Sequence, residues 1–133
     1  MPSRVWSHIC DYATMDASQK ASIVGEFDVI FGRTVPVRHP FFFVVSKWNG
    51  YDKEQFTLEV RVTSPSRRII ANSGDANITI VGGANGEGYY IAINAFLMIE
   101  FREFGEHSIE FVLNGNAVHF LPLTIAQTPQ NPA

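Results

Sequence analysis

The chain has 133 residues, which fits one domain. Its formal net charge is −3, whereas domains that bind nucleic acid usually carry a clustered basic surface, so nucleic-acid binding is not expected. Hydrophobic residues make up 46% of the chain, and charged residues make up 17%, below the roughly 25% of an average globular domain. We therefore expect the chain either to bury much of its surface or to associate.

The sequence also constrains the compartment. No apolar run approaches the roughly 18 residues that a membrane-spanning helix needs, and the N-terminus lacks the apolar segment of a secretory signal. The single cysteine, Cys10, cannot form an internal disulfide, which agrees with a reducing environment. A cytoplasmic location without membrane contact is expected.

The first third of the chain predicts strands separated by polar turns. Residues 5–13 alternate in polarity, with the aromatic side chains on one face, and residues 21–31 predict a half-buried strand. Pro36 and Pro40 bracket a crossing loop, because proline cannot donate a hydrogen bond to a neighbouring strand. Residues 41–45 (FFFVV) are apolar on both faces, which is typical of a central strand.

The middle of the chain continues this pattern. Residues 56–63 form the most regularly amphipathic strand, and residues 78–80 begin a further strand that ends in a glycine-rich loop at 82–88. Residues 89–101 are long and mostly apolar, with Asn94 in the middle. Because strands usually hold about five or six residues, this stretch is interpreted as two strands joined at a kink.

A β-hairpin is predicted near the C-terminus, where residues 109–113 and 119–125 alternate in polarity on either side of Asn114 and Gly115. Asn-Gly supplies the two positive-φ residues of a type I′ turn. With eight or nine short strands and no helical period, the chain is predicted to form an antiparallel β-sandwich, immunoglobulin-like in the broad sense, with a closed barrel as the alternative. Residues 1–126 form the domain, and residues 127–133 a disordered tail.

A resemblance accompanies these motifs. Residues 104–111 (FGEHSIEF), followed by residues 121–125 (LPLTI), resemble the last strands of immunoglobulin-like sandwiches, with His107 at the tyrosine-corner position. Together with residues 10–13 (CDYA) and 23–28 (IVGEFD), this order of motifs resembles a family of small uncharacterised bacterial β-sandwich proteins, a domain of unknown function. The resemblance spans residues 9–125 and implies a fold, but it assigns no functional residue.

The sequence contains few residues that suggest metal binding or catalysis. His8 and Cys10 share one face of the first strand while Asp11 lies on the other, so a metal site would need further ligands from His39, His107 or His119. Structural roles are favoured for these residues, and His107 is expected to bond a nearby backbone carbonyl. No metal, cofactor or catalytic residue is predicted.

Two loops are candidates for recognition. Residues 82–88 lack the Gly-Lys-Ser/Thr ending of a phosphate-binding loop and lead into a strand, which favours a hairpin loop that orders on binding a partner. Aromatic residues flank the Asn49-Gly50 turn, although burial of the tryptophan is an equal alternative. The predicted loop-recognition residues are Trp48, Tyr51, Gly83, Asn85 and Gly86.

The leading functional hypothesis is a non-enzymatic binding or assembly module that acts through an apolar sheet face and loops. The alternatives are a small metal-dependent or acid–base enzyme and a structural or capsid-like assembly subunit. Because residues 41–45 and 89–101 are apolar on both faces, we expect a homodimer or an unknown protein partner, unless the crossing loop or the N-terminal strand covers this surface. The predicted interface residues are Phe42, Val44, Phe96 and Met98.

Overall fold

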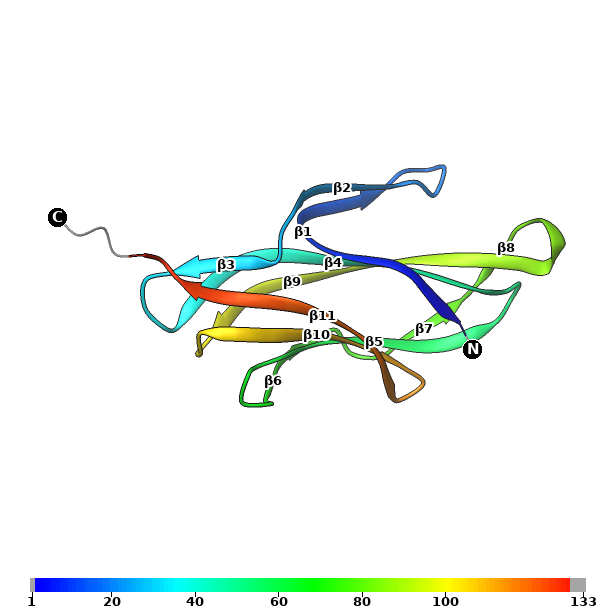
Figure 1. The fold of residues 1–133 in the computed structure, drawn as a ribbon. Coiled ribbons are helices and arrows are strands. Elements are labelled where there is room, and N and C mark those ends of the chain that lie inside the picture. The colour runs from blue at the N-terminus through cyan, green and yellow to red at the C-terminus, as the bar shows by residue number, and fades with distance from the viewer. Residues whose placement is uncertain (1, 130–133) are drawn as a thin grey trace.

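Eleven strands and one short 3₁₀ turn are found in residues 2–129, the part of the chain that the structure, a computed structural model, describes (Figure 1). In chain order they are β1 (Ser3–Met15), β2 (Ala21–Glu26), β3 (Val29–Gly32), β4 (Val37–Tyr51), β5 (Gln55–Thr63), β6 (Ile69–Asn72), β7 (Ala76–Thr79), β8 (Val81–Gly82), η1 (Ala84–Gly86), β9 (Glu87–Phe101), β10 (Gly105–Leu113) and β11 (Asn116–Gln127). Within residues 2–129, no helix is long and apolar enough to cross a membrane.

The strands form two sheets that pack together. The first sheet has the order β2-β1-β4-β9-β8, and the second has the order β3-β11-β10-β5-β6, with β7 also paired to β5. The strand pairs are antiparallel except for β3 and β11, which run parallel with Val29 opposite Thr124. The predicted all-β sandwich is confirmed, with more strands than expected.

The extra strands arise because two predicted strands are each divided between the sheets. Residues 21–31 supply β2 to the first sheet and β3 to the second, and the backbone N–H of Phe27 at the crossing donates to the carbonyl of Ile9. In the same way, β7 joins the second sheet and β8 joins the first, with Ile80 buried at the crossing. Residues 89–101, by contrast, belong to the single strand β9.

The core lies between the two sheets. Along β5, alternate residues point into the core, as the regular amphipathic pattern predicts. The largest side chains that are fully buried there are Trp48, Phe42, Phe101 and Phe111. Both sheets contribute to this cluster, so each sheet depends on the other for burial of its apolar face.

The N-terminal hairpin folds back over the outer face of the first sheet (Figure 1). β1 pairs with β4 only as far as Cys10, which lies opposite Phe43, and the rest of β1 pairs with β2 alone. Ala13 and Ile23 of this hairpin pack in one small cluster with Val45, Ile91 and Ile93 of the sheet. The expectation that the N-terminal strand could cover part of this apolar surface is confirmed.

The β10–β11 turn has the geometry that Asn-Gly predicts. Asn114 and Gly115 have φ angles of 49° and 84°, so both central residues of the turn are left-handed. The Asn114 side-chain oxygen also accepts a hydrogen bond of 3.0 Å from the backbone N–H of Thr57 in the neighbouring strand. The turn therefore fixes the hairpin and ties it to β5.

Replacing Gly115 with Val should lower the free energy of unfolding by roughly 1–2 kcal/mol, because a β-branched residue is strained at positive φ. No atom outside the turn lies near a Cβ at this position, so the cost comes from the backbone alone. Chemical denaturation measures the change. The control is Asn116→Val at an exposed position of β11, which should cost much less. Equal stability of Gly115→Val and the wild type would contradict the prediction.

The last strand extends slightly beyond the predicted domain end. Gln127 is the final residue of β11, and the backbone N–H of Thr128 donates to the carbonyl of Gly32 at 2.8 Å. The start of the predicted tail is thus still paired with β3. The rest of the predicted tail, from residue 130 onward, lies outside the described residues.

Candidate functional site

Three of the four predicted interface residues lie in the core. Phe42, Val44 and Phe96 are buried between the sheets, and the rings of Phe42 and Phe96 stack with their centroids 5.2 Å apart. The prediction that they contact a second subunit is wrong, because no partner can reach them in the folded domain. Met98, the fourth residue, is 71% exposed.

The error concerns which face of β9 points outward, and that face changes along the strand. Up to Phe96 the even-numbered residues of this strand point into the core, whereas beyond Met98 the odd-numbered Ile99 and Phe101 do so. Met98 has a φ of 52°, and this left-handed residue interrupts the alternation. Leu97 and Met98 are therefore both exposed although they are adjacent in sequence.

An apolar surface, here called the outer patch, occupies the outer face of the first sheet. It consists of Tyr12, Phe41, Phe43, Leu97 and Met98. Tyr12 and Phe41 each contact Phe43 edge-on, with ring centroids 5.4 Å and 6.4 Å apart, and Phe41 lies opposite Leu97 across the β4–β9 pair. Tyr12, Phe41 and Leu97 are 50%, 47% and 67% exposed. Large apolar side chains thus gather on one face without being covered.

Pairs of ionisable side chains lie beside the outer patch. On one side the imidazole of His8 contacts the carboxylate of Glu26 at 2.5 Å. On the other side the guanidinium groups of Arg38 and Arg102 lie 3.6 Å and 3.0 Å from the carboxylate of Glu100. An apolar centre with a charged rim is the usual organisation of a protein interface.

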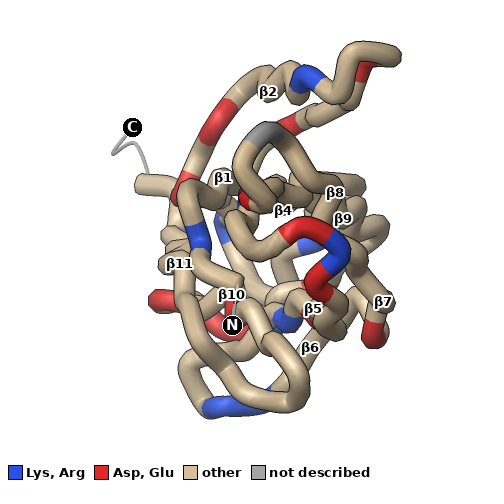
Figure 2. The backbone as a smooth tube through the Cα atoms, turned by 90° about the vertical axis from the view of Figure 1, so that its right-hand side faces the viewer, with Lys and Arg blue, Asp and Glu red and all other residues tan. Residues whose placement is uncertain are grey.

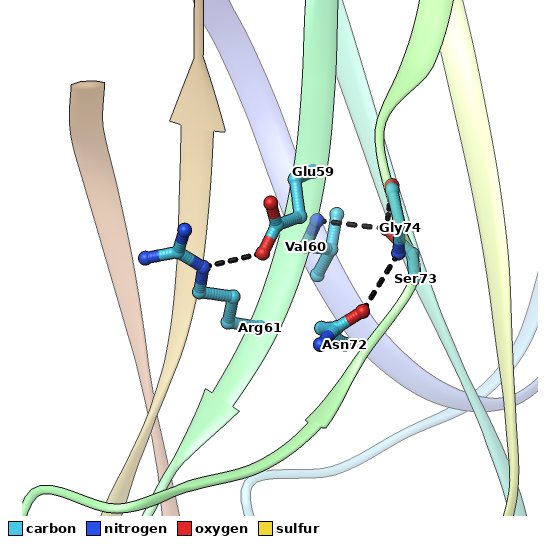
Figure 3. A network of polar contacts seen from close by, with 6 residues as sticks. All are labelled: Glu59, Val60, Arg61, Asn72, Ser73 and Gly74. Atoms are coloured by element: carbon cyan, nitrogen blue, oxygen red, sulfur yellow. Dashed lines mark hydrogen bonds and ion pairs between the residues drawn. The ribbon is translucent and has the colours of Figure 1, made fainter. Parts of the chain in front are cut away.

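The outer face of the second sheet has a different character (Figure 3). On β5, Arg61 forms an ion pair with Glu59. At the edge of the same strand, the hydroxyl of Ser73 accepts a hydrogen bond of 2.9 Å from the N–H of Val60 and donates one of 3.0 Å to the carbonyl of Gly74. Charge and fixed polar contacts thus occupy the β5 part of this sheet, whereas its exposed aromatic residues, Phe31 and Phe120, lie on β3 and β11.

The family comparison matches nearly the whole described chain. Residues 5–126 match the model of a family described as "Family of unknown function (DUF6941)". The chain belongs to this family. A comparison with curated proteins found no match. The matched range includes every residue of the outer patch, so in this member of the DUF6941 family the patch is part of the family domain.

The structure brings the predicted recognition loops together, with one exception. The backbone N–H of Asp52 donates to the carbonyl of Gly86 at 2.9 Å, which places the turn after β4 beside the glycine-rich loop before β9. Tyr51, Gly83, Asn85 and Gly86 are all at the surface of this end. Trp48 is 1% exposed and belongs to the core, so its predicted role in recognition is wrong.

A cavity that the sequence does not reveal lies under the tip of the N-terminal hairpin. Figure 2 shows the hairpin arching over β8 and β9. The space has a volume of about 430 Å³ and is lined by Met15, Gln19, Val81, Gly82, Gly83, Tyr89, Tyr90 and Ile91. It exists because β1 bends away from β4 after Cys10, and no local sequence signal marks that bend.

The four histidines of this DUF6941 family member are in separate environments. His39 lines a depression that also contains Asp11 and Glu26. His8 contacts Glu26, His119 is 3.2 Å from the hydroxyl of Ser7, and His107 is fully buried. Within residues 2–129, no three His, Cys, Asp or Glu side chains lie close enough together to hold a metal ion.

His107 occupies the corner position as predicted. Its Nδ1 is 3.1 Å from the carbonyl oxygen of Gly105, to which the neutral ring donates, and its edge packs against Phe101 with ring centroids 5.2 Å apart. The Nε2 atom is buried without a hydrogen-bond partner. Burial lowers the pKa of His107, an effect that the Gly105 carbonyl and the Glu103 carboxylate partly offset.

The lowered pKa of His107 predicts that acid destabilises the fold. Below about pH 6.5 the unfolded chain takes up a proton at this histidine more readily than the folded chain, so stability is retained at higher pH and decreases as the pH falls. Burial also lowers the pKa values of His39 and His119, which act in the same direction. Each group contributes a slope of at most about 1.4 kcal/mol per pH unit.

Urea denaturation of the wild type and His107→Phe between pH 8 and pH 5, a range that brackets the ordinary histidine pKa of about 6.5, tests this prediction. The variant should be less stable at pH 8, because it loses the bond to Gly105, and should lose less stability on acidification. Parallel pH profiles for the two proteins would show that His107 does not contribute to the acid sensitivity.

Proposed function

We propose that this protein is a non-enzymatic binding or assembly module that acts through the outer patch. The observation that carries the proposal is the exposure of Tyr12, Phe41, Leu97 and Met98 on one sheet face, next to ion pairs that form a charged rim. The second sheet also exposes Phe31 and Phe120, but its strand β5 carries the Glu59–Arg61 ion pair on the outer face. The loop end with Tyr51 and Asn85 provides a second, more polar contact surface.

The hydrophobic effect explains why such a surface favours a partner. Removing apolar surface from water is favourable by about 25 cal/mol per Å², and monomers rarely expose contiguous apolar patches above a few hundred Å². Phenylalanine, tyrosine and methionine are also enriched at protein interfaces. The outer patch consists of these three residue types and one leucine. A protein partner, which can be a second copy of the chain, is the expected ligand.

The two alternative functions, a structural assembly subunit and a small enzyme, differ in how well the structure fits them. A structural or capsid-like subunit would use the same outer patch, and open-ended particles in electron micrographs would identify it. The enzyme hypothesis has less support, because the histidines of the described chain lie in separate places and His107 is enclosed in the core. We further propose a bacterial, cytoplasmic setting, which the lone buried Cys10 and the family resemblance support.

Two matched substitutions test the proposed function. Phe41→Asp places a charge in the outer patch, and Phe120→Asp places one at a similarly exposed phenylalanine on β11 of the second sheet. Both variants should remain folded. Affinity purification followed by crosslinking mass spectrometry should find crosslinks from the outer patch to the same partner with the wild type and Phe120→Asp but not with Phe41→Asp. Identical contacts for all three proteins, or no contact for any of them, would contradict the proposal.

A further inference from the structure

The β9 strand has one long edge without a partner strand in the described part of the chain. On one side β9 pairs with β4 from Glu87 to Phe101. On its other side only Gly88 and Tyr89 are paired, with the two residues of β8. From residue 90 onward, alternate residues of β9 therefore direct backbone N–H and C=O groups toward an empty strand position.

The sheet is open here because of how β7 is used. β7 pairs with β5 in the second sheet, and the chain then crosses to the first sheet at the buried Ile80. Only Val81 and Gly82 remain to pair with β9 before the glycine-rich loop begins. The first sheet thus ends in a strand that is much longer than its neighbour.

Beyond Ile91, where the tip of the N-terminal hairpin lies over the strand, this open edge lacks the features that usually protect a sheet edge. Such edges are blocked by charged side chains, by proline, by bulges or by their short length. Between Glu87 and Glu100, β9 contains neither a charged residue nor a proline. Its one irregular residue, Met98, lies near the end of the strand, so residues 90–97 form a continuous run. The strands at the other sheet ends, β2, β3 and β6, have six residues or fewer, and the open edge of β11 before its pairing with β3 contains Pro122.

We propose that this edge pairs antiparallel with the β9 edge of a second copy of the chain. This contact is separate from the aromatic side chains of the outer patch, so it adds a second interface to the proposed function. A two-fold axis perpendicular to the sheet makes paired strands antiparallel and places each residue opposite a residue of the same strand. Like charges directly opposite each other are destabilising, and β9 avoids such pairs because it carries no charged residue from 88 to 99.

The side chains favour an axis close to Ala95. In this register Ala95 lies opposite its own copy, where a small exposed side chain avoids a clash, and Ile93 lies opposite Leu97. Residues directly opposite in an antiparallel pair point to the same face of the sheet. Ile93 and Leu97 satisfy this condition, because both lie on the outer face. Their contact would cover Leu97 and leave Phe41 and Phe43 available to another partner.

A charged substitution at the edge tests the pairing. Ala95→Lys places two ammonium groups next to each other at the axis, while its position on the outer face leaves the core unchanged. Sedimentation velocity should show a wild-type dimer and an Ala95→Lys monomer with the same melting temperature. The control is Ser22→Lys, an exposed position in the edge strand β2 of the same sheet, which should remain dimeric.

Disulfide crosslinking locates the contact. Ala95→Cys should form a covalent dimer under mild oxidation, and Ser22→Cys should not. The native Cys10 is fully buried and does not compete.

The possible outcomes separate the edge contact from the outer patch. A dimer that dissociates with Ala95→Lys but persists with Phe41→Asp is the expected result. A wild type that stays monomeric at all concentrations overturns the edge pairing, while a partner lost from Phe41→Asp would still support the proposed function. A dimer that survives Ala95→Lys and dissociates with Phe41→Asp also overturns the edge pairing and supports the outer patch. If both substitutions dissociate the dimer, the absence of an Ala95→Cys crosslink overturns the edge pairing.

Discussion

Replacing Phe42 with Asp should unfold the domain, whereas the same replacement at Phe41 should leave it folded. Phe42 is 0% exposed and stacks on Phe96 in the core, while Phe41 is 47% exposed on the outer face. Loss of a buried phenylalanine costs about 3–5 kcal/mol, and an unpaired buried carboxylate adds a large desolvation penalty. The sum is comparable to the total stability of a small domain, roughly 5–15 kcal/mol.

Circular dichroism and thermal melting of the two purified variants provide the measurement. Phe42→Asp should be insoluble or lack a cooperative melting transition, and Phe41→Asp should melt close to the wild type. These adjacent residues differ mainly in the face on which they lie, so they serve as controls for each other. Cooperative melting of Phe42→Asp at the wild-type temperature would place Phe42 outside the core.

Replacing Trp48 with Ala should lower the free energy of unfolding by about 3–5 kcal/mol, because it opens a cavity between the sheets. The indole ring lies against Phe56 and Phe111, with ring centroids 6.4 Å and 6.0 Å apart. Its Nε1 donates a hydrogen bond of 2.9 Å to the hydroxyl of Ser46, which is itself fully buried. The substitution therefore also leaves a buried hydroxyl without this partner, which adds to the cost.

Guanidinium denaturation gives the change in stability for Trp48→Ala. Tyr51→Ala is the control, because Tyr51 is an exposed aromatic residue at the end of the same strand. Its replacement should change the stability by less than about 0.5 kcal/mol, as is usual for surface substitutions. Similar losses in the two variants would contradict the assignment of Trp48 to the core.

The parts of the fold that the sequence predicts are those with one apolar face. The alternation in β5 and the Asn114-Gly115 turn are local signals, and the structure confirms both. In β4 and β9 both faces are apolar, so alternation cannot show which residues point inward. The predicted interface was therefore assigned to core residues such as Phe42 and Phe96, and the left-handed Met98 changes the phase of β9 beyond them.

Of the candidate contact surfaces, only the loop end was predictable from the sequence. Tyr51 and Gly86 were expected at the surface, and the structure places their loops side by side. The outer patch depends on the packing of β4 against β1 and β9, and the cavity depends on the bend of β1. Such arrangements arise from contacts between residues distant in the chain. A single sequence does not encode them as a local pattern.

The parallel pair of β3 and β11 has a consequence for synthesis on the ribosome. The partner of Val29 is Thr124, so the second sheet cannot be completed until the last strand has been released from the exit tunnel. Until then the nascent chain keeps the edges of both β3 and β10 unpaired, and contacts between distant residues also form slowly. A ribosome-stalled or C-terminally truncated chain that lacks β11 would expose the core faces of Ile109 and Phe111. Such a chain would be a substrate for chaperones and proteases.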